Sequence, residues 1–131
     1  MQLTTEIPEE IIKDYFQPLE YGNPADHFPV LGKIIDKAAA DYSDDIAVID
    51  IDEKSFTFKD VHDKVNKLAM GFIEAGCTPD SKICICMPSK VEWEIAFLAA
   101  LKVCVVVPAD DWVPPDTNKY IIEHAGSKHV V

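Results

Sequence analysis

The chain has 131 residues, of which 48% are hydrophobic and 27% charged, a mixture typical of a globular protein rather than a disordered or collagen-like one. Twelve lysines and arginines stand against 23 acidic residues, so the formal net charge is −11. Nucleic-acid binding needs clustered cations that displace counterions from phosphates, and an anionic membrane surface repels so acidic a chain. The composition therefore argues against both as partners.

The expected location is the cytoplasm. The first ten residues lack the cationic start and the apolar run of a signal peptide. The longest nearly apolar stretch, 95–109, contains Lys102 and is too short to cross a bilayer, so no transmembrane segment is expected. Three of the four cysteines have strongly apolar neighbours, which favours reduced, buried thiols over a disulfide framework. The cysteines are Cys77, Cys84, Cys86 and Cys104.

The chain is expected to divide into an irregular N-terminal lead-in, 1–29, and an α/β domain, 30–131. A short helical pattern begins at Pro8, and prolines and glycines interrupt regular structure after it. From residue 30 helical and extended patterns alternate, which predicts a mostly parallel sheet. The expected elements are a helix through 38, a hairpin of 46–51 and 55–58, a helix capped by Thr57 and ended by Gly76, a strand at 82–87, a helix opened by Ser89, a strand at 103–107, a helix at 116–125 and a strand at 128–131.

Two helix starts carry the spacing of a capping box. Thr57 and Asp60 stand three residues apart, so hydroxyl and carboxylate can each accept from the other residue's amide. Ser89 and Glu92 repeat the spacing. The apolar run 103–107 has the pattern of a strand covered on both faces.

No metal or catalytic cluster emerges from the polar residues. Cys84 and Cys86 lack the paired spacing of structural zinc, so buried thiols are the preferred interpretation. Asp50 and Asp110, each near a second aspartate, lack the glycine and distant glutamate of a calcium loop and are interpreted as solvated turn carboxylates. His62 is expected to be solvated, and His124 to lie in a last helical turn where a cation meets the helix dipole.

Trp112, Pro114 and Pro115 form an apolar loop after the 103–107 strand. Ligands of α/β sheets bind beyond the carboxyl ends of strands, so this loop could face a pocket. Cover for a further part of the domain is an equally good explanation.

The order of these motifs resembles the opening of the large domain of adenylate-forming enzymes, the AMP-dependent synthetase/ligase family that includes the acyl-CoA synthetases. The resemblance lies in SFTFKDV over 55–61, LAMGF over 68–72, KICICMPS over 82–89, AFLAALK over 96–102 and VVVP over 105–108, and the flanks 44–49 and 120–131 agree with it. Three departures are a missing glycine at 103–104, Asp80-Ser81-Lys82 in place of Gly-Asp, and Ser89 in place of asparagine.

The resemblance implies a parent enzyme that activates a carboxylic acid with ATP and magnesium and passes the acyl group to coenzyme A. A glycine-rich phosphate loop, a magnesium carboxylate and a lysine are needed for this, and no matching motif is present. We therefore assign no catalytic, cofactor-binding or metal-binding residue and expect an N-terminal fragment that is inactive alone. Its expected partner is the remaining part of the synthetase, on the same or a separate chain. The alternative is a free-standing, non-catalytic α/β interaction module; a flavodoxin-like ligand binder is the weakest interpretation.

Overall fold

The computed structural model describes residues 31–131, so the predictions for 1–29 lie outside the described residues. The helices and strands follow the predicted order. They are η2 (Leu31–Lys33), α2 (Ile34–Tyr42), β1 (Ile46–Ile49), β2 (Ser55–Thr57), α3 (Phe58–Glu74), β3 (Lys82–Ile85), α4 (Val91–Val103), β4 (Val105–Pro108), α5 (Pro115–Ala125) and β5 (His129–Val130).

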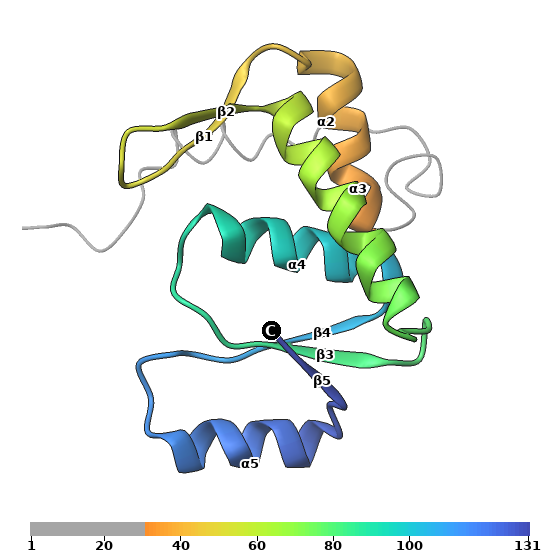
Figure 1. Ribbon diagram of the computed structural model, residues 1–131, viewed down its shortest axis with the longest axis vertical. Helices are drawn as coiled ribbons and strands as arrows, with labels where there is room; N and C mark the ends of the chain where they lie inside the picture. The colour runs from red at the N-terminus through yellow and green to blue at the C-terminus, as the bar shows by residue number, and fades with distance from the viewer. Residues whose placement is uncertain (1–30) are drawn as a thin grey trace, which may run out of the picture.

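The main sheet has three parallel strands in the order β4-β3-β5. β3 is central, and its Ile83 pairs with Val106 of β4 and His129 of β5. Of the described helices, α4 and α3 lie on one side of this sheet, whereas only α5 lies on the other (Figure 1). The predicted α/β class and parallel sheet are confirmed.

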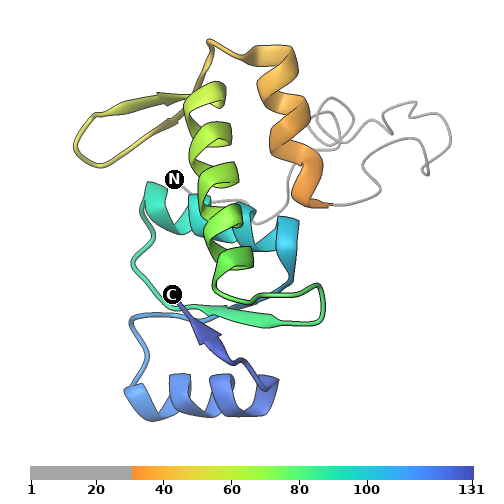
Figure 2. The ribbon, with the colours of Figure 1, turned by 45° about the vertical axis from the view of Figure 1, so that its right-hand side comes forward.

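Strands β1 and β2 form the predicted antiparallel hairpin, separate from the main sheet (Figure 2). Its turn is held by Asp50, whose Oδ1 accepts hydrogen bonds of 2.9 Å from the amides of Asp52 and Lys54. A short acidic side chain that accepts from nearby amides is a standard way to stabilise such a turn. The Asp50 carboxylate thus acts in the turn, as the sequence indicates.

Helix α3 begins with the predicted capping box. The Asp60 amide donates to Thr57 Oγ1 at 3.1 Å, and the Thr57 amide donates to Asp60 Oδ2 at 3.0 Å. The helix ends before Gly76, which has a φ of 88°, a left-handed conformation that glycine tolerates best. Its inward face buries four apolar residues, Val61, Val65, Ala69 and Phe72.

The hydrophobic core lies between α3, α4 and β3. Ile83, Cys84 and Ile85 of β3 have no exposed surface, and neither has Val65 of α3. Gly32 is also buried, because η2 approaches α4 so closely that a Cβ there would lie 2.6 Å from the Leu101 carbonyl oxygen. This contact joins the start of the described chain to the end of α4.

Two local predictions are wrong. Helix α4 begins after Lys90 with no side-chain cap, so Ser89 does not cap it. The run 103–107 is also not a single strand covered on both faces. Val103 belongs to α4, the Cys104 amide donates to the Ala100 carbonyl, and β4 starts at Val105, which is 48% exposed at an edge of the described sheet.

Candidate functional site

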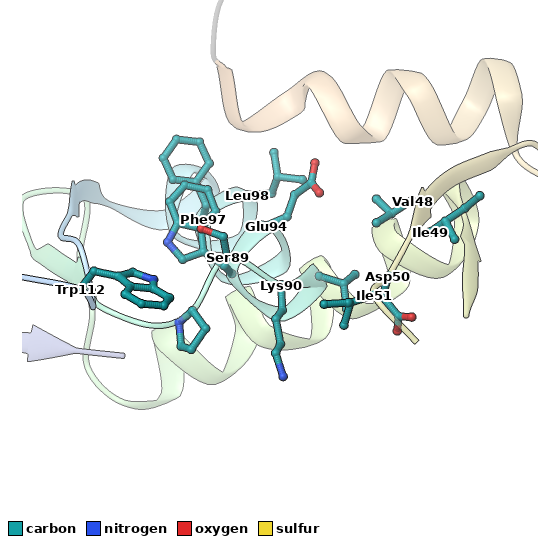
Figure 3. Close-up of a pocket in the computed structure, with 13 residues that line it drawn as sticks. Val48, Ile49, Asp50, Ile51, Ser89, Lys90, Glu94, Phe97, Leu98 and Trp112 are labelled. Atoms are coloured by element: carbon teal, nitrogen blue, oxygen red, sulfur yellow. The ribbon is translucent and has the colours of Figure 1, made fainter. Parts of the chain in front are cut away.

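A groove of about 820 Å³ opens between the hairpin, the start of α4 and the loop after β4 (Figure 3). Its wall is aromatic, since the rings of Trp93 and Phe97 stack with centroids 5.0 Å apart. Its rim consists of Ile49 and Ile51 from the hairpin and Trp112 from the loop. We call this feature, with these five residues as its apolar lining, the Trp112 groove.

The rim residues are unusually exposed for apolar side chains. Ile49 is 62% exposed, Ile51 83% and Trp112 90%. The loop that carries Trp112 is held by Asp110, whose Oδ1 accepts from the Trp112 amide at 2.9 Å. Of the two explanations left open by the sequence, facing a pocket and covering a further part of the domain, the structure is compatible with both, because Trp112 lines a groove that is open to solvent.

The polar groups of the groove form no catalytic arrangement. Lys90, Glu94 and Asp50 line it with Ser89, and within the part of the chain that the structure describes no ion pair or hydrogen bond joins these side chains to one another. The Asp50 carboxylate is already engaged by the hairpin turn. Catalysis by acid and base needs donor and acceptor within hydrogen-bond reach of each other or of a common atom. The groove therefore offers apolar surface rather than reactive groups.

A second polar cluster joins three helices. Lys102 of α4 donates to Asp36 of α2 and, at 2.6 Å, to Asn66 Oδ1 of α3, and its side chain is only 15% exposed. His62 Nε2 lies 3.1 Å from Asp36 Oδ1 and 2.9 Å from Asn66 Nδ2. The expectation that His62 is solvated is thus wrong, because its side chain is 28% exposed and belongs to this cluster.

The cysteines are free thiols in the described structure. Cys77 and Cys84 are buried, as predicted, whereas Cys86 and Cys104 are half-buried. Burial raises the pKa of the Cys84 thiol, with a smaller contribution from Cys86, and burial likewise raises the pKa of Cys104. Raised values keep both thiols protonated and weakly nucleophilic near neutral pH.

The remaining polar predictions concern helix ends and metals. His124 lies in the last turn of α5, as predicted, and its ring stacks on Tyr120 with centroids 5.3 Å apart. Within residues 31–131, no three histidine, cysteine or acidic side chains are grouped so that they could hold a metal ion.

None of the described helices is both long and apolar enough to cross a membrane.

The family model for AMP-binding enzymes matches residues 35–131 of this fold. The chain belongs to this family. It is 26% identical over 132 residues to bacitracin synthase 2 of Bacillus licheniformis, a match that covers 100% of this chain and 5% of that protein. It is 30% identical over 82 residues to acetyl-coenzyme A synthetase of Vibrio parahaemolyticus, covering 59% of this chain and 13% of that protein.

Solved structures give the same fold. The N-terminal subdomain of Klebsiella oxytoca NpsA superposes with a TM-score of 0.73 at 20% identity, covering 78% of this chain and 27% of the subdomain. The N-terminal domain of FACL13 from Mycobacterium tuberculosis gives 0.73 at 21% identity, covering 77% and 26%. The chain thus spans about a quarter of these solved structures and a smaller share of its curated relatives.

The comparisons confirm the family that the sequence motifs indicate, but not the finer resemblance to acyl-CoA synthetases. Sequence reasoning missed the polar cluster around Lys102, and of the Trp112 groove it indicated only the loop that carries Trp112. Lys102, a cation that follows the apolar run 95–101 of α4, signalled that a partner was needed, although nothing local identified Asp36. The exposed Ile51 gave no signal, because a hairpin tip and a helix start 40 residues away meet only through the fold.

Proposed function

We propose that this chain forms the opening unit of the large domain of an enzyme that activates a carboxylic acid with ATP, and that it supplies scaffold rather than chemistry. The observation that carries the proposal is the match of residues 35–131 to the AMP-binding family, together with a fold that aligns to about a quarter of an N-terminal subdomain. The groups that such an enzyme needs would lie on polypeptide beyond this unit.

Among residues 31–131 no loop fits the phosphates of ATP or coenzyme A, and no acidic cluster fits magnesium. A phosphate cradle needs consecutive backbone amides that a glycine-rich loop can bring close to the ligand. The five glycines of this sequence are widely separated, and the four that the structure describes serve other purposes. Gly32 packs on Leu101, Gly71 lies within α3, and Gly76 and Gly126 follow helix ends. We therefore assign no reaction step to a residue of this chain.

Pyrophosphate exchange tests the proposal directly. The purified 131-residue chain, given ATP, magnesium and a panel of amino acids, acetate, longer fatty acids and aromatic acids, should give no exchange above a heat-treated control. The native polypeptide, isolated from its source cells, should have a mass several times 14.6 kDa and should exchange pyrophosphate with one acid class. Exchange by the 131-residue chain, or a native mass of 14.6 kDa, would overturn the proposal.

The acid and its acceptor distinguish two versions of this function. The sequence motifs favour an acyl-CoA synthetase, whereas bacitracin, tyrocidine and surfactin synthases among the relatives favour activation of amino acids. With the native polypeptide, exchange that depends on a fatty or short-chain acid and yields an acyl-CoA product supports the first. Exchange that depends on an amino acid, without a coenzyme A product, supports the second.

A free-standing interaction module is the second candidate function. The observation that favours it is the set of core side chains without exposed surface, which gives the chain a core of its own. The module predicts one cooperative, monomeric unfolding transition of the 131-residue chain. A molten chain, or one that aggregates through its open strand edges, would contradict it.

A further inference from the structure

Helices α2 and α3 lie side by side and run in opposite directions, and α3 extends beyond the start of α2 toward the main sheet (Figure 1, Figure 2). Two contacts fix their alignment. The ring of Tyr42, at the end of α2, lies 6.0 Å from that of Phe58, at the start of α3. Further along the pair, Lys102 of α4 bridges Asp36 and Asn66. Each step back along α2 is therefore matched by a step forward along α3.

This alignment brings three exposed apolar side chains to one place. Ile73 follows Asn66 by two helical turns, so it continues the side of α3 that faces α2, at a level that α2 itself does not reach. Leu31 precedes Asp36, and Met70 follows Asn66, by little more than one turn, so Leu31 lies level with Met70. We call Leu31, Met70 and Ile73 the Ile73 stripe. Their exposed fractions are 58%, 55% and 51%.

The stripe differs from the rest of the outer surface of α3, where charged side chains such as Lys59, Asp63 and Lys67 are exposed. Single exposed apolar residues are ordinary, but neighbouring ones mark an interaction surface. We infer that residues 1–30 fold back and pack on the Ile73 stripe through an apolar face formed by Ile11, Ile12, Tyr15 and Phe16. This inference does not depend on the proposed function.

The sequence before Leu31 supplies a segment of the right kind. Its residues 11, 12, 15 and 16 are apolar, and this spacing places them on one face of a helix. Pro8 followed by two glutamates is typical of a helix start. Fourteen residues separate Phe16 from Leu31, a length that reaches about 45 Å when extended and is ample for the chain to turn back along α3.

Charge favours this segment over a second copy of the chain. Residues 1–30 carry six acidic residues and one lysine. The stripe is flanked by the exposed Lys33 and Lys67, with Glu74 as an acidic neighbour, and within residues 31–131 no ion pair engages either lysine. Two whole chains with a net charge of −11 each repel one another.

Methionine oxidation by dilute hydrogen peroxide, read by mass spectrometry of peptides, tests the inference on the 131-residue chain. Met87 is half-buried and serves as the internal reference. If residues 1–30 cover the stripe, Met70 should be oxidised no faster than Met87, although Met70 has more than half of its surface exposed among the described residues. A Met70 that reacts several-fold faster than Met87, at the rate of free methionine in the same solution, would overturn the inference.

A substitution in the segment identifies the occupant. Phe16→Asp should raise the Met70 oxidation rate several-fold and leave that of Met87 unchanged, which also shows that the core is intact. Tyr21→Asp is the matched control, an aromatic residue of the same segment outside the predicted apolar face, and should leave both rates unchanged. A Met70 that stays slow in Phe16→Asp, or is released equally by Tyr21→Asp, would contradict the inference.

Two further outcomes point to other occupants and also overturn the inference. Protection of Met70 that grows with the concentration of the 131-residue chain identifies a second copy. Protection that is present only in a longer native polypeptide identifies a segment beyond residue 131.

A double-mutant cycle gives an independent readout of the same contact. Ile73→Ser should lower the unfolding midpoint of the 131-residue chain by several degrees, but should have almost no effect in a chain that already carries Phe16→Ser, because contacting residues are not additive. The matched pair is Ile73→Ser with Tyr21→Ser, whose effects should add. Additive effects for Ile73→Ser and Phe16→Ser would show that the two side chains do not meet.

Discussion

Helices α4 and α5 flank the same three-stranded sheet, yet they are buried to very different degrees. Five residues of α4 are buried, whereas none of the eleven residues of α5 is. The difference follows from the second layer. α4 lies between the sheet and α3, while α5 is the only described helix on the opposite side of the sheet (Figure 1). A helix on a sheet is fully buried only when something packs behind it.

This contrast shows on which side of the sheet the described residues form a closed hydrophobic core. On the α4 side, apolar side chains of α3, α4 and β3 close on one another, and Ala99 and Ala100 have no exposed surface. On the α5 side, Ile121 and Ile122 are only half-buried although the helix is well formed. Secondary structure on both sides is therefore similar, and the stability that each side contributes should differ.

The largest expected effect comes from shortening a buried side chain in the core on the α4 side. Ile85→Ala, at a position with no exposed surface, should lower the free energy of unfolding by about 3 kcal/mol, because it removes buried methyl groups and leaves a cavity. Ile122→Ala on α5 is the matched variant and should cost less than half as much. Urea denaturation of both variants measures this, and equal losses would mean that the two sides are equally well packed.

The next effect tests how the helical layer is tied together. Lys102→Met removes the cation that donates to Asp36 and Asn66, and should cost about 1–2 kcal/mol, since hydrogen bonds to charged groups are stronger than neutral ones and Lys102 is largely buried. Lys37→Met is the control, because its pair with Asp41 is exposed and screened by solvent, so its removal should cost clearly less. If Lys102→Met lowers the free energy of unfolding no more than the control does, the cluster contributes no more than a surface ion pair.

The elements of both sides could be predicted from sequence because their signals are local. The capping box at Thr57 involves residues three apart, and Gly76 and Gly126 mark helix ends through their own φ angles. The remaining helices and strands were predicted from apolar residues repeating every 3.6 positions and from short apolar runs. The family could likewise be predicted, because the order of such local motifs along the chain is typical of it.

The contacts that assemble these elements could not be predicted. Gly32 packs on the Leu101 carbonyl, and Lys102 binds Asp36, in each case across more than 60 residues. The Trp112 groove combines the hairpin, the start of α4 and the loop after β4. Nothing local specifies such pairings. The prediction that Ser89 caps α4 was wrong for a different reason. The helix begins one residue later than predicted, so Lys90 occupies the cap position.

The two helix starts provide a matched test at the level of single hydrogen bonds. Thr57→Ala should lower the free energy of unfolding by about 1 kcal/mol, because it removes the hydroxyl that accepts from the Asp60 amide. Ser89→Ala, at the same position of a similar motif, should have almost no effect, because α4 has no side-chain cap. Thermal unfolding of both variants measures the difference. A comparable loss for Ser89→Ala would indicate that Ser89 caps α4 in solution.

The smallest effect is the pH dependence of that same cap. The pKa of Asp60 is lowered, first by the hydrogen bond from the Thr57 amide and then by its hydroxyl. The unfolded chain therefore takes up a proton on Asp60 more readily than the folded chain. The stabilisation is complete above the ordinary aspartate pKa of about 4 and is lost as the pH falls through the lower folded value.

Asp60→Asn should thus lower the unfolding midpoint at pH 6, and its difference from wild type should shrink toward pH 3. Asp52→Asn is the control, since no hydrogen bond of the Asp52 side chain is found in the described hairpin. A difference for Asp60→Asn that stays constant with pH would mean that its carboxylate charge does not contribute to the helix start.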